Sequence, residues 1–589
     1  MKKRLLTLAM LALVMTSAKA SVEINPTNFP DESFRTAIME WANTDGDNTL
    51  SDEELAAVIT WELHDVENFK GLEYFTSLET IWIGLLWKEG PLNATNLDLS
   101  ALKNLWRIGI GGYNITSFDV SANTKVTDLE IADCPKLASI KAPANVEEFT
   151  FTNLPSLAVV DFSPYKKLST IAFRNVGVQD FDFSSHPAIA SIHLYGTEEE
   201  FYTLNSINVA GCPELYEISF EWTKTQSIRL KNLQKLYALA VNNCETALIA
   251  VEDMPELGGI TCENSDIKEL NIRNCPELTG VNCNDNRLQT LIIDDSPKLG
   301  TVYAKDNYMM WLDLQYVKNE EGGIQNWFNV EGQQPRATAY KLKSDAVGLK
   351  VHERFEKERM LNLKTNDKDM TPDWLTVDGV KYLVITTEGS TADDLKDKKA
   401  AYKYETKWPF PWAGENPEDN NMPVELTLTG VEKLNSWIKF KTTDFDKPLK
   451  GEVGGTLVGA TPEDIVRSDY YDGALTFTSS DETVMKVDTN TGALTIVGPG
   501  TATISVIGAA TDYRNAPATI SYQVEIIMPF IAGDANGDGA VDAADIVEVV
   551  NYIMNKTSTK FVEAAADANN DGTVDAADIV AIVNIIMGK

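Results

Sequence analysis

Apolar residues recur about every 21 residues between Leu78 and Gln315, in units that fit the pattern L-x-x-L-x-L. Successive units are 20 to 22 residues apart, except for steps of 27 and 26 residues. Because alternate side chains of a strand point to opposite faces, each unit predicts a short strand with one apolar face. Such strands bury a shared core only collectively, so residues 71–315 are predicted to form a stacked β-solenoid. The first apolar position of each unit falls at Leu78, Leu105, Val126, Val146, Leu168, Ile189, Leu215, Leu236, Leu257, Leu278 and Leu299.

These units resemble the leucine-rich repeat, a family whose turns are supported by a ladder of asparagines. Asn286 and Asn307 occupy the ladder position, Cys134 and Cys244 substitute for it, and Tyr113 does not fit. The ladder is therefore partial, which leaves open how the backbone groups of several turns are satisfied.

The strand residues two, four and six places after the first apolar position are predicted to face the concave side. The resemblance implies that this side is the interaction surface, and aromatic residues are favoured anchors of such surfaces. Many positions there are small or acidic, and the alternative is a solvated face without a dedicated partner. The predicted partner-binding anchors are Trp82, His193, Tyr195 and Tyr303.

Two further segments, 316–428 and 429–527, show short alternating strands punctuated by turn residues. In the second segment, strands joined by the turn Gly498-Pro-Gly500 resemble a group 2 bacterial immunoglobulin-like domain. We predict a β-sandwich from each segment. The predicted fold class is thus a multidomain, β-rich chain, in which the solenoid precedes two sandwiches and a small helical module.

The helical module, 533–589, contains one 23-residue sequence written twice, with six differences between the copies. Each copy places oxygen-bearing side chains at loop positions 1, 3, 5, 9 and 12, a backbone carbonyl at position 7 and glycine at position 6. This order suits a calcium ion, which prefers six to eight oxygen ligands. The predicted calcium ligands are Asp534, Asn536, Asp538, Ala540, Asp542 and Asp545 in the first copy, and Asp567, Asn569, Asp571, Thr573, Asp575 and Asp578 in the second.

A calcium loop followed by one helix, given twice, resembles a type I dockerin. The resemblance implies two bound Ca²⁺ ions and docking into a cohesin-like protein domain. In that family the docking contacts include loop positions 10 and 11 and the following helix, where cellulosomal dockerins more often carry hydroxyl and basic residues. Near-identity of the copies permits docking in two orientations, and a clasp onto the adjacent sandwich is the alternative. The implied contact residues are Ala543, Ala544, Val550, Asn551, Ala576, Ala577, Val583 and Asn584.

Residues 21–70 are predicted to form a helical cap that contains a possible third calcium loop. The spacing from Asn43 to Glu54 fits an EF-hand, although position 6 is Asn48 rather than glycine. An equally good interpretation is a capping box that begins a helix at Asp52. The candidate ligands of this loop are Asn43, Asp45, Asp47, Thr49 and Glu54.

Residues 1–20 have the features of a signal peptide, with basic residues, an apolar run and small residues before a cleavage point near Ala20. No other stretch is apolar enough to predict a membrane span. The net charge of −36 disfavours nucleic acid and anionic lipid as partners. We therefore expect a secreted, extracellular or cell-surface protein.

The six cysteines follow the repeat, which favours buried thiols over a disulfide framework. A disulfide between Cys262 and Cys283 is the alternative, because these residues fall on neighbouring predicted strands. Tryptophans in the segment 408–412 either stack on sugars or pack against the sandwich.

The four histidines fall in no metal-ligand or nucleophile motif, so we expect a non-catalytic protein. The predicted function is binding or adhesion, in which the solenoid recognises a host or bacterial surface protein or a glycan. Two alternatives stay open: an accessory subunit of a polysaccharide-degrading assembly, and a glycoside hydrolase whose acid pair is hidden among many carboxylates.

Overall fold

The computed structural model describes residues 21–315, 317, 327–365, 368–386, 398–408, 420–556 and 559–589. The predicted signal peptide, residues 1–20, lies outside the described residues. The chain divides into two compact units. The first contains Met1–Ala337, Val351–Pro372 and Asp397–Thr429, and the second contains Thr338–Lys350, Asp373–Lys396 and Gly430–Lys589.

The first unit begins with a small helical cap. Its elements are β1 (Val22–Glu23), α1 (Glu32–Ala37), the π-helical turn η1 (Ile38–Ala42), β2 (Thr49–Leu50) and α2 (Asp52–Ala57). The side chain of Asp31 accepts from the N–H of Phe34 at the start of α1. Phe34 in turn packs against Trp61, with 5.7 Å between ring centroids, and so seats the cap on the first solenoid strand.

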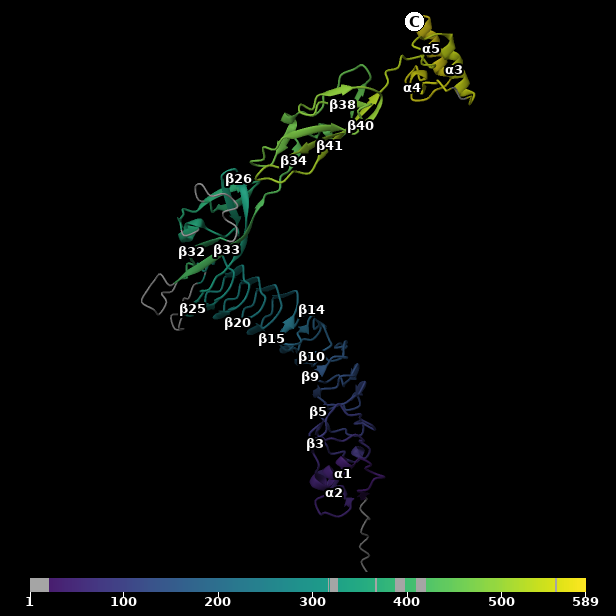
Figure 1. The fold of residues 1–589 in the computed structure, drawn as a ribbon. Coiled ribbons are helices and arrows are strands. Elements are labelled where there is room, and N and C mark those ends of the chain that lie inside the picture. The colour runs from purple at the N-terminus through teal and green to yellow at the C-terminus, as the bar shows by residue number, and fades with distance from the viewer. Residues whose placement is uncertain are drawn as a thin grey trace, which may run out of the picture. The chain divides into compact units, whose positions relative to one another are not determined.

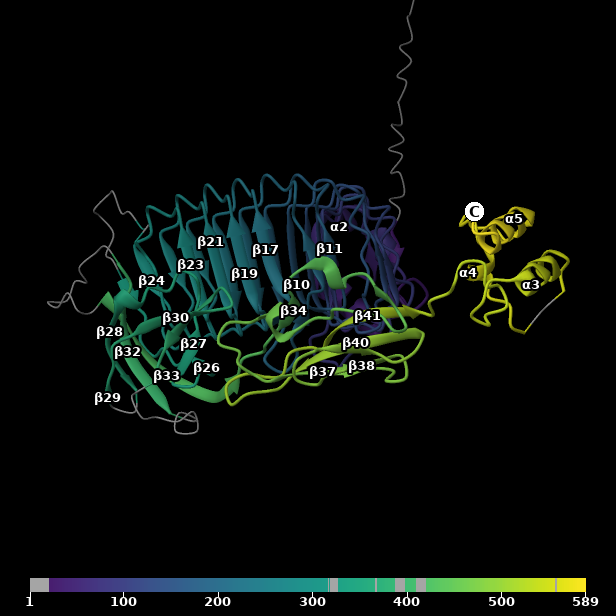
Figure 2. The same cartoon turned by 90° about the horizontal axis from the view of Figure 1, so that it is seen from above.

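A parallel sheet of 13 strands runs the length of the solenoid (Figures 1 and 2). It begins at β3 (Thr60–His64), ahead of the expected boundary at residue 71, and ends at β25 (Trp327–Asn329). All eleven first apolar positions of the repeat are fully buried. The predicted leucine-rich-repeat solenoid is therefore confirmed. Between its ends the sheet contains β4 (Thr80–Gly84), β5 (Arg107–Gly111), β7 (Asp128–Ala132), β9 (Glu148–Leu154), β10 (Thr170–Val176), β12 (Ser191–Tyr195), β15 (Glu217–Glu221), β18 (Ala238–Asn242), β20 (Gly259–Thr261), β22 (Gly280–Asn282) and β24 (Thr301–Tyr303).

Shorter parallel sheets form on other sides of the solenoid turns. The largest has four strands: β17 (Ser227–Lys231), β19 (Leu248–Glu252), β21 (Glu269–Arg273) and β23 (Thr290–Asp294). Figure 2 shows them as successive rungs. Two-stranded pairs are β6 (Ser117–Asp119) with β8 (Ser139–Lys141), β11 (Asp180–Asp182) with β14 (Ser206–Asn208), and β13 (Tyr202–Thr203) with β16 (Thr223–Lys224).

The asparagine ladder extends beyond the two asparagines that the sequence indicated. Asn286 and Asn307 donate to backbone carbonyls and accept from the N–H groups of Ile267 and Leu288, as expected of the ladder. Gln333 continues the series by donating to the carbonyl of Ala304 and accepting from Met309. In the turn before that of Asn286, the hydroxyl of Ser265 accepts from the N–H of Cys244 and donates to the carbonyl of Val241. The thiol of Cys244 likewise accepts from the N–H of Thr223 and donates to the carbonyl of Phe220, so hydroxyl and thiol groups take over where amides are missing.

A second set of polar residues stabilises the corners that follow the strands. Asn or Asp occupies a left-handed backbone conformation there in many turns, which these residues tolerate better than most. Asp133, Asn243, Asn264 and Asp285 are examples, with φ between 49 and 55°. The regular spacing of these Asn and Asp residues could have predicted the corners from the sequence, but the pattern L-x-x-L-x-L does not include them.

Antiparallel strands follow the solenoid in both units. Those of the first unit are β28 (Met360–Thr365), β29 (Lys368–Asp369), β32 (Lys399–Glu405) and most of β33 (Asn421–Lys433). The second unit contains most of β26 (Arg336–Lys343), with β27 (Ala346–Lys350), β30 (Asp373–Val377) and β31 (Val380–Val384).

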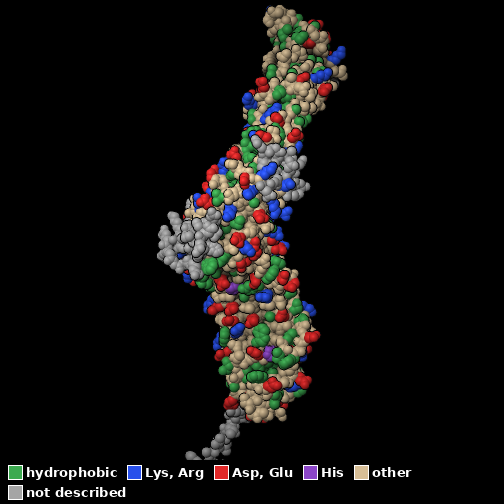
Figure 3. Space-filling model, turned by 60° about the vertical axis from the view of Figure 1, so that its left-hand side comes forward, with side chains coloured by type: hydrophobic (Ala, Val, Ile, Leu, Met, Phe, Trp, Pro, Cys, Tyr) green, Lys and Arg blue, Asp and Glu red, His purple; other side chains and the backbone are tan. Residues whose placement is uncertain are grey.

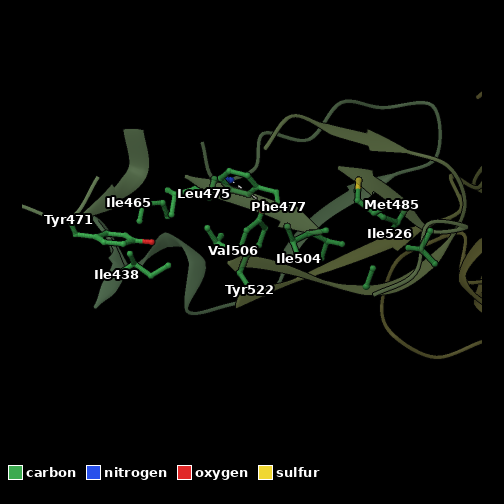
Figure 4. Close-up of a cluster of buried hydrophobic side chains, with 14 residues drawn as sticks. Ile438, Ile465, Tyr471, Leu475, Phe477, Met485, Ile504, Val506, Tyr522 and Ile526 are labelled. Atoms are coloured by element: carbon green, nitrogen blue, oxygen red, sulfur yellow. Dashed lines mark hydrogen bonds between the residues drawn. The ribbon is translucent and has the colours of Figure 1, made fainter. Parts of the chain in front are cut away.

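Residues 438–527 pack around their own hydrophobic core. Figure 4 shows Phe477, Val506 and Tyr522 among the side chains of this core. The main sheet has the order β35-β41-β40-β37, with β34–β36 and β38–β39 as two-stranded pairs. These strands are β34 (Ile438–Phe440), β35 (Leu449–Glu452), β36 (Ile465–Arg467), β37 (Leu475–Ser479), β38 (Met485–Val487), β39 (Leu494–Ile496), β40 (Gly500–Gly508) and β41 (Ile520–Ile527).

The C-terminal module contains α3 (Ala543–Ile553), α4 (Glu563–Ala566) and α5 (Ala576–Ile586). Both long helices begin with a capping box, and their last turns are followed by left-handed Asn555 and Gly588, with φ of 57° and 62°. Val549 of α3 and Ile582 of α5 are fully buried in one small core. The two copies therefore fold against each other.

Candidate calcium loops and binding surfaces

Each C-terminal loop is wound around its own side-chain oxygens. The carboxylate of Asp534 accepts hydrogen bonds from the N–H groups of Asp538 and Gly539, at 3.0 and 2.8 Å. Asn536 Oδ1 accepts from the N–H of Asp538, and Asp538 Oδ1 accepts from that of Ala540. Gly539 has a φ of 91°, a conformation that side chains rarely allow, which explains why glycine stands at position 6.

The position-12 aspartate closes each loop from its end. Asp545 is fully buried, and its two oxygens accept from the N–H groups of Asn536 and Asp542, at 2.9 and 2.8 Å. Asp578 is equally buried and accepts from Asn569 and Asp575 in the same way. The shorter aspartate thus reaches where an EF-hand uses glutamate, and it forms the helix capping box at the same time.

The oxygen-bearing residues of these loops fit calcium by type and order. Burying an ionised carboxylate costs several kcal/mol unless opposite charge or hydrogen bonds compensate it. Two N–H groups compensate Asp545 only in part, and a divalent cation would supply the rest. No cluster of three His, Cys, Asp or Glu side chains able to hold a metal is found in the described part of the chain. A calcium loop differs from such a cluster, because some of its ligands are neutral oxygens. Here these are the amide oxygens of Asn536 and Asn569 and the backbone carbonyls at position 7.

The N-terminal loop shares part of this hydrogen-bond pattern. Glu54 accepts from the N–H of Ser51 at position 9 and from the N–H groups of Thr44 and Asp45, as the position-12 residues of the other loops do. The left-handed residue at position 4, Gly46 with φ 74°, also has counterparts in Gly537 and Asn570.

The N-terminal loop differs at its beginning. The Oδ1 of Asn43 accepts from the N–H of Gly46, while its amide nitrogen donates to the carbonyl of Asp47. Asn43 therefore offers one neutral oxygen where Asp534 offers a carboxylate. Hydrogen bonds from Ser51 and Thr44 outweigh burial and lower the pKa of Glu54 to about 2. The capping box of α2 is present, as the second interpretation of this segment requires.

Comparison with known proteins identifies the C-terminal module. Residues 532–587 match the family model described as "Dockerin type I domain". The module is a type I dockerin. Such domains bind calcium and dock into cohesin domains, and proteins that carry them are typically extracellular.

None of the curated proteins matches the chain. Among solved structures, the functional domain of InlJ from Listeria monocytogenes is 14% identical, with 70% of this chain and 99% of that chain covered and a TM-score of 0.32. InlP from the same organism is 12% identical, with coverages of 70% and 99% and a TM-score of 0.21. The plant peptide hormone receptor RGFR1 is 12% identical, with coverages of 46% and 54% and a TM-score of 0.26. The repeat fold of this chain rests on its own strand stacking.

The dockerin helices expose a duplicated apolar surface. The predicted contact residues Ala543, Ala544, Ala576, Ala577, Val550 and Asn584 are exposed, whereas Asn551 and Val583 are half-buried. The sequence interpretation omitted larger exposed residues, which occur as pairs 33 positions apart. These pairs are Val547 and Val580, Ile553 and Ile586, and Met554 and Met587. Their apolar character on an exposed helix face was the signal that could have found them.

The solenoid anchors do not form one cluster. His193 and Tyr195 stack with 6.0 Å between ring centroids, and Arg174 lies 5.5 Å from the Tyr195 ring. Trp82 lies on β4 near the N-terminal end of the sheet, and Tyr303 on β24 near its other end. The predicted face thus carries three separate aromatic positions.

Trp82 borders a cavity of about 520 Å³ on this face. Glycine makes room for the indole, because a Cβ on Gly109 would lie 1.8 Å from the ring. The same cavity is lined by Trp106, which is exposed and was not predicted, and by Arg107, which pairs with Glu130 at 3.4 Å. Acidic and basic side chains are interspersed over the solenoid surface visible in Figure 3.

The other aromatic candidate is buried. Trp408 stacks on Phe328, with 5.2 Å between centroids, and is 5% exposed. Phe410 and Trp412 lie outside the described residues. Packing, rather than sugar stacking, is therefore the role of Trp408.

The cysteines are buried free thiols. Burial raises the pKa of Cys134, Cys212 and Cys275 to about 11 and that of Cys244 to about 12. Cys262 and Cys283 are hydrogen-bonded neighbours, which together with burial raises the pKa of Cys262.

Both identified module types, the dockerin and the repeat solenoid, are non-catalytic, and no catalytic domain is evident in the described part of the chain. Within that part, no helix has the length and apolar character needed to cross a membrane.

Proposed function

We propose that this protein is a secreted, non-catalytic binding or adhesion protein that a calcium-folded dockerin attaches to a cohesin-like partner. The observation that carries the proposal is the C-terminal dockerin on a chain that also contains a long repeat solenoid. The dockerin supplies attachment, and the exposed face of the solenoid supplies recognition of a surface protein or a glycan. The sandwich regions 316–428 and 429–527 act as spacers between them.

The dockerin holds two calcium ions, one in each loop. Support comes from the matching hydrogen-bond patterns around Asp534 and Asp567, and from the buried position-12 residues Asp545 and Asp578. Without the ions, carboxylates of one loop repel each other, so binding and folding of the module are coupled. Asn43, Asp45, Asp47, Thr49 and Glu54 form a weaker third site, because its first position lacks a charge.

An accessory or enzymatic role in a polysaccharide-degrading assembly is the second candidate, because dockerins attach proteins to cohesin-bearing assemblies. Hydrolysis of a polysaccharide by the purified protein, lost when one acid pair is neutralised, would establish the enzymatic version.

Calcium-coupled folding is tested by hydrogen exchange on the full chain. Chelation is expected to remove amide protection from α3 and α5, while the solenoid strands stay protected because their core involves no ion. Asp545→Asn should unprotect α3 more than α5 and lower calcium affinity by at least about tenfold, a loss of ~1.4 kcal/mol. Asp52→Asn, in the exposed first turn of α2, is the control. Unchanged protection of α3 and α5 after chelation would sink the proposal.

A further inference from the structure

A cavity of about 510 Å³ lies on the first unit, at the corners that follow the strands of the long sheet. Its walls come from the two repeats of irregular length, whose insertions span about 84–95 and 196–205. Its floor comes from the regular repeats between them. Residues that line it include Pro91, Asp133, Asn175, Gln179, Glu200 and Phe201.

The first wall is fixed to the solenoid by a buried carboxylate. Asp65 accepts hydrogen bonds from three consecutive N–H groups, those of Leu86, Trp87 and Lys88. Burial opposes ionisation of Asp65, yet these hydrogen bonds outweigh it and lower its pKa. Pro91, which lines the cavity, is thereby held on an anchored loop.

The second wall is fixed just as firmly. The buried Tyr202 donates its hydroxyl to the carbonyl of Val178, and its N–H donates to the carbonyl of Trp222 at 2.8 Å. Phe201 meets Trp222 edge-to-face, with 5.6 Å between centroids. The aromatic wall therefore exists before any ligand arrives, which lowers the entropic cost of binding.

The floor carries a directed chain of polar groups. Asn175 Nδ2 donates to Asn153 Oδ1 at 3.2 Å, and Asn153 Nδ2 donates to Asp133 Oδ1 at 2.6 Å. This chain leaves Asn175 Oδ1 buried with no donor among the described residues. Because this oxygen is buried, the polar groups that a ligand in the cavity can reach are those of the exposed lining residues Asp133, Gln179 and Glu200.

The remaining lining selects the chemistry of that ligand. Pro91, Pro135, Pro155 and Phe201 offer apolar ring faces beside the polar floor. The lining contains carboxylates and amides but no Lys or Arg, so an anionic ligand finds no counter-charge. Neutral rings with hydroxyls along their edges suit both sets of groups, because each hydroxyl donates and accepts.

A peptide strand fits less well. Strand addition needs unpaired backbone groups at a sheet edge. At this corner the N–H of Asp133 donates to the carbonyl of Thr152, and that of Gly177 donates to Leu154. Neighbouring rungs of the solenoid repeat at about 4.8 Å, so equivalent groups of the floor are spaced more widely than the ~3.3 Å advance of one amino acid in a strand.

A second cavity of about 370 Å³ shares Pro91 and Asp133 with the first and leads to Trp82. The two cavities together form a longer groove, which suits a chain of sugars rather than a single sugar. We infer that this corner groove, bounded by Pro91 and Phe201, binds a neutral oligosaccharide chain lying along the solenoid. The inference rests on the proposed role of the solenoid in recognition and names both the site and the ligand class.

The test uses the calcium-loaded full chain and neutral cello-, manno- and xylo-oligosaccharides in calorimetry. Oligogalacturonides serve as the anionic comparison, and a peptide library as the peptide arm. Binding of one neutral series is expected, and Phe201→Ala should weaken it at least about tenfold, by loss of the aromatic wall. Gln179→Ala and Glu200→Ala, at exposed positions that leave the core intact, should each weaken it several-fold.

Glu198→Ala is the matched control, because Glu198 lies in the same insertion but outside the lining. It should leave affinity unchanged. No binding of any neutral series, binding insensitive to Gln179→Ala and Glu200→Ala, or preference for oligogalacturonides or peptides would overturn the inference. Binding lost in Trp82→Ala but retained in Gln179→Ala and Glu200→Ala would also overturn it. If the inference fails in these ways, the proposed function still stands when the same preparations dock into a cohesin domain and bind a protein on the sheet face.

Discussion

At the scale of single residues, small side chains decide what the solenoid face can present. Trp82 lies flat because Gly109 on the next strand leaves its space free. Gly259, on the same sheet, has nothing near the position of a Cβ. Both glycines lie on strands of the same sheet, but only Gly109 is needed to make room for a neighbouring side chain.

Replacing Gly109 by alanine should displace the Trp82 ring and destabilise the protein by about 1–3 kcal/mol, because an added methyl overlaps the indole. Tryptophan fluorescence and denaturant unfolding measure the two effects. Gly259→Ala is the matched control and should be neutral or slightly stabilising, since alanine restricts the unfolded chain. Equal results for the two variants would show that the indole does not depend on Gly109.

Glu54 makes the N-terminal cap sensitive to acid. Its pKa of about 2 in the folded protein lies below the usual 4.5. The deprotonated form is thus favoured by folding, so its contribution is complete above pH 4.5 and is lost as pH falls toward 2. The protection factors of the α2 amides, which correct for the intrinsic pH dependence of exchange, should fall over this interval in the wild type, whereas Glu54→Gln should show the weakened protection at every pH. A wild-type protection of α2 that does not change with pH would contradict this assignment.

At the scale of elements, the dockerin helices combine two roles in one segment. Their first turns close the loops through Asp545 and Asp578, and their exposed faces carry paired apolar residues. Because the pairs recur at the same spacing on α3 and α5, a partner can meet either helix in equivalent surroundings. Tyr552 limits the equivalence, since it stacks on Phe561 at 4.4 Å and donates its hydroxyl to Glu563, whereas the second copy has Ile585 at this position.

Docking in two orientations predicts that single changes are tolerated. Val547→Glu or Val580→Glu alone should weaken binding to a cohesin domain only slightly, because the unaltered helix remains available. The double variant should lose binding by several orders of magnitude, since a carboxylate is then desolvated in both orientations. Calorimetry with a cohesin domain measures this, and Glu482→Gln, at an exposed position outside the dockerin, is the control. Complete loss in one single variant would show a single orientation.

At the scale of the whole molecule, a buried arginine supports each unit beside its apolar core. In the first unit, Arg359 is 3% exposed and pairs with Asp313 at 3.0 Å. In the second unit, Arg514 is fully buried and pairs with Asp378 at 3.7 Å. It also donates to backbone carbonyls of Asn435 and Asp469. The turn after β30 is thereby joined to the loops of residues 430–527.

Arg514→Ala should destabilise the second unit by about 3–5 kcal/mol, because carbonyls and a carboxylate lose a shared partner in a buried place. Lys450→Ala removes an exposed pair with Glu525 and should cost less than about 1 kcal/mol. Hydrogen exchange measured during thermal unfolding gives the stability of each unit separately, because β40 reports on the second unit and the solenoid strands report on the first. A cost for Arg514→Ala as small as that of the control would mean that the pair is not structural.

The sequence by itself determined the solenoid and the calcium loops, because both depend on local periodicity. The apolar positions from Leu78 to Leu299 are buried because a strand exposes alternate faces, and Gly539 and Gly572 follow from backbone geometry within one loop. Tertiary structure alone decided which side chains meet across turns. The stack of Trp408 on Phe328 and the pairing of Arg514 with Asp378 join residues whose separation is unrelated to the 21-residue repeat, so only packing brings them together.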